Sequence, residues 1–308
     1  SINTIAVQTV EALGVVDSYA YATEKLGLSL VPEDMAVSPL AMGGLTYGLS
    51  TVEMAAAFSA FANNGVYNSP KMYTEVRDSN GETVLKNEGE THVAMKETTA
   101  YFMNQMLTSV VNAGTGTSAR FSGMTIAGKT GTTDENRDRY FAGFSPYYSA
   151  AVWTGYKSNE RFSESLGNPS AVLWREVMRR IHDGLENKDF NSCSGLTQVT
   201  VCQDSGLLAT SACEADLRGS RVRSVTVAAG TAPTESCTLH KIYDYCTEGK
   251  CLATEFCPPD TVQQVALLDY TREDYGPNIV AADSAYLASA FETVLEDGTV
   301  QKPPCTVH

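Results

Sequence analysis

The sequence predicts an α/β fold of the α+β type, in which helices flank an antiparallel sheet. Amphipathic, helix-like segments come first along the chain, and strand-like segments separated by short turns follow them. One more helix-like segment comes after the strands. Helices, a meander of neighbouring strands and then a helix is the order expected when helices pack on such a sheet. The helix-like segments span about 4–16, 51–62, 96–111 and 169–183, and the strand-like segments span about 124–132, 139–145 and 148–156.

The helix-like segments carry start and stop signals. Ser50 and Glu53 form a capping box ahead of residues 51–62, and Asn63-Asn64-Gly65 ends that segment. Asn168-Pro169 is a typical helix start, because proline fits the first turn without losing a hydrogen bond. The segment 96–111 carries two apolar rows at four-residue spacing, one of Phe102, Met106 and Val110 and the other of Met103, Leu107 and Val111.

The strand predictions depend on turn chemistry and on residue type. Asn80-Gly81 favours a tight primed turn, so residues 72–78 and 82–86 are predicted to form a hairpin. Residues 148–156 are rich in apolar and aromatic side chains, which is typical of a central strand. Beyond residue 190, a short strand is predicted over 223–228 and an amphipathic helix over about 284–296.

Composition excludes several classes of protein. The 308 residues are 43% hydrophobic, which suffices for a sizeable core and excludes wholesale disorder. The net charge of -14 makes a basic nucleic-acid-binding surface implausible, so no nucleic-acid partner is expected. No apolar run approaches the roughly 18 residues that a membrane-spanning helix needs, so no span is expected within this chain.

The cysteines divide the chain. All 8 lie from Cys193 onward. We therefore predict a catalytic-type domain over 1–185, a polar linker over 186–198 and a Cys-rich tail over 199–308. The chain starts at Ser1 without a methionine, and we expect it to be part of a longer protein.

The strongest local signal is the segment Ala127-Gly128-Lys129-Thr130-Gly131-Thr132-Thr133. On a strand, Thr130 and Thr132 share one face, while Gly131 leaves the backbone open to a ligand. Lys129 supplies a positive charge for a substrate carboxylate, and a backbone N–H can help hold an oxyanion. The segment does not meet the phosphate-loop pattern. Taken alone, the tripeptide is common enough that a surface turn with solvated Lys and Thr side chains is the favoured explanation.

A second motif changes this interpretation. Ser-x-Asn, here Ser1-Ile2-Asn3, is paired with Lys-Thr-Gly in penicillin-binding proteins and class A β-lactamases. On these motifs the chain resembles the transpeptidase domain of class A (bifunctional) penicillin-binding proteins, which implies a β-lactamase/transpeptidase-like fold. Further stretches that resemble the family cover most of residues 1–240 in order: 44–55, 61–65, 138–144, 167–170, 205–210 and 230–234.

One part of the family pattern is missing. The nucleophile of the family lies in a Ser-x-x-Lys motif ahead of Ser-x-Asn, and no serine of this chain is followed three residues later by lysine. We therefore expect the nucleophile on an upstream segment of the same polypeptide, which would be a partner of this chain.

The resemblance also implies residue roles. Ser1 would relay a proton to the departing D-alanine, Asn3 would hydrogen-bond the substrate amide, and Lys129 would support Ser1 electrostatically. A plainer alternative is that Ser1 or Asn3 only caps the helix that follows. The residues expected to bind the terminal carboxylate and oxyanion of the substrate are Thr130, Gly131, Thr132 and Thr133.

Two chemistries compete for the cysteines. Eight in the last 116 residues fit disulfides in an oxidising exterior, with Cys202–Cys213 or Cys202–Cys237 as possible pairs. The alternative is zinc, because Cys237-x-x-His240 has ligand-like spacing and Cys202 and Cys213 could complete a site. We predict disulfides, with no metal and no cofactor. The candidates are Cys202, Cys213, Cys237, Cys246, Cys251 and Cys257.

The resemblance implies a peptidoglycan DD-transpeptidase that cross-links stem peptides through a serine acyl-enzyme and is acylated by β-lactam antibiotics. It would work on the extracellular face of the bacterial cytoplasmic membrane, anchored through an absent N-terminal segment. The whole protein would also carry a glycosyltransferase domain. The alternatives are a DD-carboxypeptidase or β-lactamase, which passes the acyl group to water, and a non-catalytic extracellular binding module.

Overall fold

The computed structural model describes residues 2–268, 293–294, 300–301 and 304–308. The chain divides into two compact units, Ser1–Ser194 and Gly195–His308. The boundary falls inside the segment 186–198 that composition marks as polar, although its last residues already belong to a strand. None of the helices in the described part of the chain combines the length and apolar character that crossing a bilayer requires.

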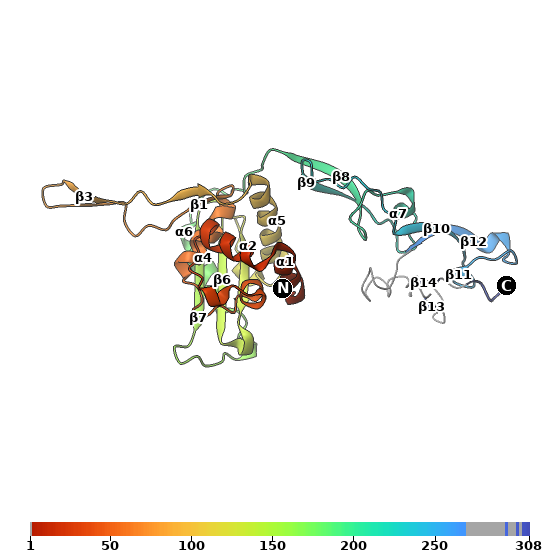
Figure 1. The fold of residues 1–308 in the computed structure, drawn as a ribbon, viewed down its shortest axis with the longest axis horizontal. Coiled ribbons are helices and arrows are strands. Elements are labelled where there is room, and N and C mark those ends of the chain that lie inside the picture. Colours follow the sequence, from red (N-terminus) through yellow and green to blue (C-terminus); the bar gives the residue numbers. More distant parts are fainter. Residues whose placement is uncertain (1, 269–292, 295–299, 302–303) are drawn as a thin grey trace. The chain divides into compact units, whose positions relative to one another are not determined.

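The first unit contains a three-stranded antiparallel sheet with the order β5-β6-β7 (Figure 1). These strands are Ala127–Thr132, Asp138–Phe144 and Ser149–Gly155, so all three predicted strands are confirmed in order and in kind. Among the described residues β5 pairs only with β6, which makes β5 an edge strand of the sheet.

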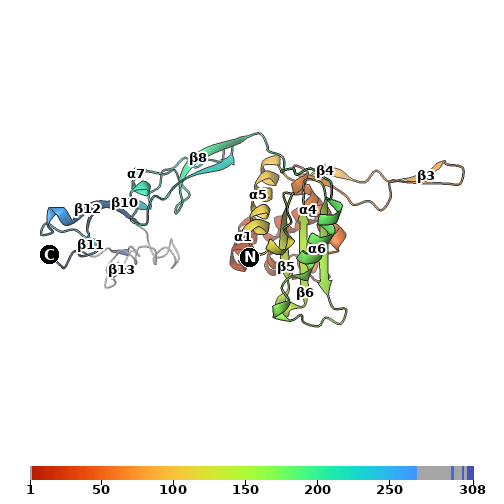
Figure 2. The same ribbon diagram turned by 180° about the vertical axis from the view of Figure 1, so that it is seen from behind.

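Helices cover both faces of this sheet. Helix α4 (Thr51–Ala62) packs on β6 and β7, where the hydroxyl of Ser149 donates to the carbonyl of Ala55. Helix α6 (Pro169–Ile181) packs on the same two strands from the other side, and α5 (Glu97–Ala113) runs beside β5 (Figure 2). The predicted helices-on-sheet architecture is confirmed.

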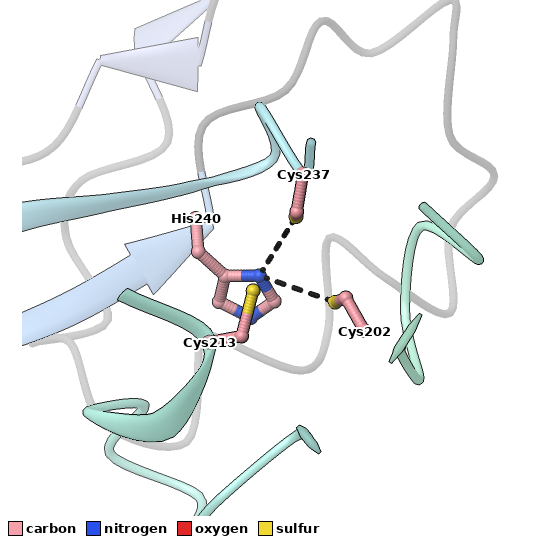
Figure 3. Close-up of side chains that lie close together, drawn as sticks. All are labelled: Cys202, Cys213, Cys237 and His240. Carbon is pink, nitrogen blue, oxygen red and sulfur yellow. Dashed lines mark hydrogen bonds between the residues drawn. The ribbon is translucent and has the colours of Figure 1, made fainter. Parts of the chain in front are cut away.

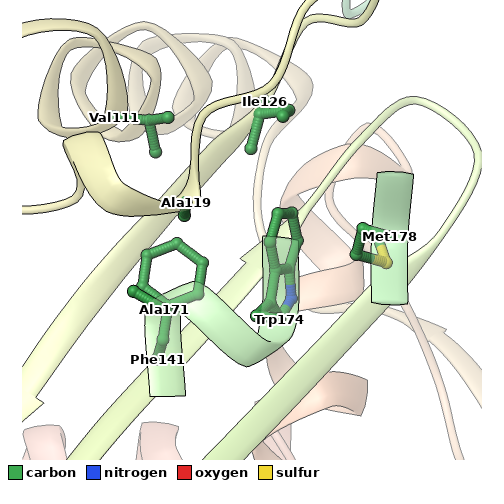
Figure 4. Packing of buried hydrophobic residues seen from close by; sticks show 7 residues of the cluster. All are labelled: Val111, Ala119, Ile126, Phe141, Ala171, Trp174 and Met178. Carbon is green, nitrogen blue, oxygen red and sulfur yellow. The ribbon is translucent and has the colours of Figure 1, made fainter. Parts of the chain in front are cut away.

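The core between α6 and the sheet is built around Trp174 (Figure 4). Its side chain is fully buried, packs edge-on against Phe141 at 5.1 Å between ring centroids, and donates its indole N–H to the carbonyl of Ala150 at 3.0 Å. Tryptophan residues are expected in the core more often than at a ligand site. Trp174 meets this expectation, whereas for Trp153, which is 47% exposed, it is wrong.

The helix caps and the hairpin turn predicted from the sequence are present in the structure. Ser50 accepts from the backbone of Glu53 and the Glu53 carboxylate accepts from the backbone of Ser50, so the capping box of α4 is confirmed. Asn168 caps α6 by accepting from Ala171. The predicted hairpin forms with shorter strands, β2 (Glu75–Arg77) and β3 (Thr83–Lys86), and Gly81 takes a φ of +85° in the turn.

The remaining elements of the first unit are short helices and one small strand pair. The strand pair is antiparallel and joins β1 to β4. In chain order these elements are α1 (Asn3–Leu13), α2 (Val15–Ala20), a π turn (Tyr21–Lys25), α3 (Val37–Met42), β1 (Val66–Asn68), β4 (Thr91–Val93), and 3-10 turns at Pro32–Asp34, Thr117–Ala119, Asp134–Asn136 and Glu164–Leu166.

The second unit is made of strands and short turns. Its strands β8 (Leu196–Cys202) and β9 (Val222–Ala228) form one antiparallel pair, and β10 (His240–Cys246) lies between β11 (Cys251–Leu252) and β12 (Val262–Leu268). Short helical turns at α7 (Ser211–Glu214) and Pro259–Thr261 connect them. The predicted helix 284–296 lies outside the described residues except 293–294, which form strand β13 (Thr293–Val294) paired with β14 (Val300–Gln301).

Candidate active site

The Lys-Thr-Gly segment lies on β5, as the sequence predicted. The antiparallel register places Thr130 opposite Phe141 and Gly131 opposite Tyr140. Because side chains alternate along a strand, Thr130 and Thr132 share the face of the sheet that carries Phe141. Lys129 and Gly131 lie on the opposite face. The two threonines therefore share one face of the edge strand, as the alternation in the sequence predicted, and Lys129 lies on the other.

Lys129 is half-buried. Its Nζ donates to the carbonyl of the following residue, Thr130, at 3.0 Å. Burial lowers the pKa of Lys129 below its ordinary value, because an ammonium group loses hydration when it leaves water. The hydrogen bond to Thr130 holds this amino group against the backbone of β5.

Thr130 has a neighbour that the sequence did not indicate as functional. The hydroxyls of Thr115 and Thr130 lie 2.8 Å apart. Thr115 belongs to the segment Gly114-Thr115-Gly116, which directly follows α5. A threonine between two glycines directly after a helix is the sequence feature that could have indicated Thr115 as a site residue. The structure thus adds a second hydroxyl at this part of the strand.

Two glycines on β5 are needed for different reasons. A Cβ on Gly128 would lie 2.6 Å from Cζ of Phe141 and 2.8 Å from the carbonyl oxygen of Ala142, so the buried ring excludes any side chain there. A Cβ on Gly131 would meet only the side chain of Tyr140, at 3.0 Å from its Cβ. Gly128 therefore serves the core, whereas Gly131 keeps the face that carries Lys129 open.

Tyr140 and Glu53 lie near this face. The hydroxyl of Tyr140 is buried and has no hydrogen-bond partner among the described residues. Burial, with a smaller contribution from the negative charge of Glu53, raises the pKa of Tyr140 to about 12. Burial alone would raise the pKa of Glu53, but hydrogen bonds from Ser50 and Ser29 outweigh it and lower that pKa to about 2. The phenol stays neutral and the carboxylate stays charged at neutral pH.

The other predicted site residues have mixed outcomes. Ser1 lies outside the described residues. Asn3 is the first residue of α1 and is exposed. The residue that precedes the helix is Ile2, so the capping role suggested for Asn3 is wrong. The contacts of α1 are with α2 and α3. Thr133 accepts from the backbone of Asp138 at 2.8 Å and closes the turn between β5 and β6.

A separate group of chemically active side chains lies in the second unit. The sulfur atoms of Cys202, Cys213 and Cys237 and a ring nitrogen of His240 all lie within 4.8 Å of one another, and all four residues are buried (Figure 3). The expected bridges Cys202–Cys213 and Cys202–Cys237 are not formed in this structure, in which these cysteines are free thiols. A second group consists of Cys246, Cys251 and Cys305, with Cys257 packed against them.

Comparison with known proteins agrees with the motifs on β5. Residues 12–171 match the family "Penicillin binding protein transpeptidase domain", and residues 192–242 match "Penicillin-binding protein 1A, C-terminal domain". The first match covers 160 of the 308 residues, and the chain belongs to the class A penicillin-binding proteins. The resemblance inferred from the sequence is confirmed.

The relatives are longer than this chain. Penicillin-binding protein 1A of Clostridium perfringens is 38% identical over 248 residues, which cover 78% of this chain and 30% of the relative. Penicillin-binding protein 1A of Clostridium botulinum is 33% identical over 289 residues, which cover 93% of this chain and 34% of the relative. The chain thus spans about a third of the length of these curated relatives.

Among solved structures, penicillin-binding protein 1A of Haemophilus influenzae superposes with a TM-score of 0.58 at 17% identity, covering 76% of this chain and 39% of the other. At this identity the likeness concerns the fold. It confirms the predicted β-lactamase/transpeptidase-like arrangement.

Proposed function

We propose that this chain supplies the Ser-x-Asn and Lys-Thr-Gly parts of a serine D-Ala-D-Ala transpeptidase that cross-links peptidoglycan stem peptides and is acylated by β-lactams. The observation that carries the proposal is the position of Lys129 to Thr132 on an edge strand of the sheet, with a half-buried lysine, in a member of this family.

An edge strand suits a peptide substrate. The outer N–H and C=O groups of β5 can pair with an extended peptide, as in recognition by strand addition. Strand pairing fixes the peptide along β5, and the positive charge of Lys129 attracts its terminal carboxylate. Thr130 and Thr132 add hydroxyl groups on the other face of the same strand.

The chemical step requires a nucleophile that this chain does not contain, because it has no Ser-x-x-Lys motif. We propose that a preceding segment of the same polypeptide supplies the serine. That serine would attack the carbonyl between the two D-alanines and release the terminal one, with Ser1 passing a proton to the departing amine. An amine from a second stem peptide would then displace the enzyme and complete the cross-link.

The strand edge also suits the acyl-enzyme. A carbonyl under attack develops negative charge on its oxygen, and a fixed backbone N–H stabilises that charge at no reorganisation cost. The N–H of Thr132 is the donor that we assign to this task. The same geometry would accept the carbonyl of a β-lactam ring, which makes these antibiotics partners. The site would face the exterior of the cell, from a protein anchored by a segment outside this chain.

The test is acylation of the longer protein that contains this chain and its preceding segment. Labelling with a fluorescent penicillin and locating the adduct by peptide mass should place it on a serine ahead of residue 1. Replacing Lys129 by alanine should slow acylation by about 100-fold or more, as expected for loss of a fixed charge near the reacting group. Lys129→Arg should retain part of the rate.

The matched control is Lys86→Ala. Lys86 lies on β3 with a side chain that is 66% exposed, so its removal should leave labelling unchanged. Unchanged labelling in Lys129→Ala would contradict the role of Lys129. An adduct that water releases rapidly would favour the β-lactamase or carboxypeptidase alternative, and absence of any adduct would favour a non-catalytic binding module.

A further inference from the structure

The second unit brings together four side chains from three separate segments, because Cys237 and His240 are only three residues apart. Cys202 ends β8, Cys213 lies in α7, Cys237 precedes β10, and His240 is the first residue of β10 (Figure 3). Their exposed fractions are 0%, 0%, 6% and 4%. Three thiols and an imidazole are thus held in one buried place, and we ask which chemistry needs them there.

The distances agree with a tetrahedral metal site. Cys202 Sγ lies 3.5 Å and Cys237 Sγ lies 3.4 Å from Nδ1 of His240. Zinc binds sulfur at about 2.3 Å and histidine nitrogen at about 2.0 Å, and a tetrahedral angle between such bonds separates the two ligand atoms by about 3.5 Å. These two sulfur–nitrogen distances therefore match the separation in a tetrahedral site, and all four ligand atoms lie within 4.8 Å of one another.

The other nitrogen of His240 is oriented as in metal centres. Nε2 lies 2.9 Å from a carboxylate oxygen of Asp216, which is itself buried and held by Arg218. Histidine ligands usually donate the second ring N–H to a carboxylate, and this contact fixes the tautomer that leaves the other nitrogen free to bind metal. The pair of Asp216 with His240 therefore directs Nδ1 towards the three sulfurs.

Backbone amides point at two of the sulfurs. The N–H of Asp204 lies 3.4 Å from Sγ of Cys202, and the N–H of Thr210 lies 3.4 Å from Sγ of Cys213. Hydrogen bonds of this kind fix the position of a ligand atom around a metal. Asp204 is in turn fixed by Arg218 and Arg221, at 2.8 and 2.9 Å.

Disulfide formation explains this arrangement less well. Three cysteines can form only one bridge, which leaves a buried thiol over, and a bridge gives no role to the imidazole or to the carboxylate behind it. A Cys-His-Asp nucleophilic site has similar contacts. It needs a thiol that a substrate can reach, whereas Cys202 and Cys213 are fully buried.

We propose that Cys202, Cys213, Cys237 and His240 form a structural zinc site that holds the second unit together. Closed sites with three cysteines and one histidine are typical of structural zinc, and the binding energy of such a metal is folding energy. The site joins β8 to β10, which are far apart in the sequence. It replaces the disulfide expectation for these three cysteines.

The other cysteine group shapes the design of the test. This group contains four cysteines: Cys246, Cys251, Cys257 and Cys305. Because their number is even, pairing them as two disulfides would leave no thiol over. The measurement must therefore be a difference between variants of the 308-residue chain. A change of one metal equivalent reports on the first group, whatever the second group does.

The experiment measures the zinc content of the purified chain after dialysis, by mass spectrometry of the metal. Cys213→Ser should lose one zinc per chain relative to the unaltered protein, because it removes one of four ligands. Cys193→Ser is the matched control, since Cys193 lies in the first unit outside both groups and should change nothing. Equal zinc content in Cys213→Ser and the unaltered chain would overturn the proposal. So would a metal-free protein with a bridge among these three cysteines.

A second variant distinguishes weaker metal binding from misfolding. Asp216→Asn keeps the size of the side chain and all four ligands, so zinc should still bind, but a competing chelator should extract it at about 10–100-fold lower concentration. Asp244→Asn, an exposed change on β10, should leave chelator resistance unaltered. Equal resistance in Asp216→Asn and the unaltered protein would show that His240 is not a ligand.

Discussion

Replacement of Gly128 by alanine tests the packing of the sheet that carries the site. The new Cβ would lie 2.6 Å from the Phe141 ring, 2.8 Å from the carbonyl oxygen of Ala142 and 2.9 Å from the Cα of Gly143. Two of these three atoms belong to the backbone of β6 and cannot turn aside. The ring has no free space either, because Phe141 is fully buried against Trp174.

Overpacking of this kind costs about 1–3 kcal/mol. For a unit of 150–250 residues, each kcal/mol lowers the melting temperature by about 2–4 °C, so we expect the first unit of Gly128→Ala to melt about 2–12 °C lower. Urea unfolding followed by tryptophan fluorescence is the second measurement, since Trp174 reports on this core. A lower midpoint with an unchanged slope indicates a loss of stability rather than a change of mechanism.

Two other glycines serve as controls. A Cβ on Gly44 meets nothing within 4 Å, so Gly44→Ala should alter stability by no more than about 0.5 kcal/mol. Gly131→Ala meets only the side chain of Tyr140, and we expect it to slow acylation more than it lowers stability. If Gly128→Ala unfolded at the same urea concentration as Gly44→Ala, the packing argument would be refuted.

Three further predictions concern stability. Trp174→Phe removes a hydrogen bond to the partly buried carbonyl of Ala150 and ring volume from a fully buried position, so it should cost about 1–3 kcal/mol in urea unfolding. Trp153→Phe at an exposed hydrogen bond to Asp138 should cost much less. Equal costs would show that burial does not decide the effect. Asn168→Ala should cost about 0.5–2 kcal/mol through loss of the α6 cap, and a melting temperature equal to that of the unaltered protein would contradict this. The folded-state pKa of Glu53, about 2 against an ordinary 4.5, predicts a contribution to stability that is full above pH 4.5 and is lost as the pH falls towards 2. As the pH falls, the stability of Glu53→Gln should therefore decrease less than that of the unaltered protein. Parallel acid denaturation curves for the two proteins would contradict the lowered pKa of Glu53.

The sequence predicted those parts of the fold that depend on neighbouring residues. The capping box of Ser50 with Glu53, the cap at Asn168 and the turn at Asn80-Gly81 all act within four residues, and each is present in the structure. The three sheet strands were found for the same reason, since consecutive strands of a meander need only short turns.

Helix α5 shows where periodicity stops being informative. Two apolar rows were predicted on it, and the four-residue spacing is the same in both. The structure buries Leu107 and Val111 and leaves Met106 56% exposed. The buried row also includes Asn104, whose amide donates to the carbonyl of Phe61. Packing against α4 and the sheet determines which side of α5 is buried.

The sequence by itself determined the family and the segment that carries Lys129, because short motifs suffice for both. Only the tertiary structure decided the relations between distant segments. A loop after α5 brought Thr115 to Thr130. The spacing of Cys237 and His240 was visible in the sequence, but their approach to Cys202 depends on strand pairing and on Leu208, which bridges to β8 and to Ser236. Contacts between residues that are tens of positions apart form only when the elements pack together, and no local sequence pattern specifies them.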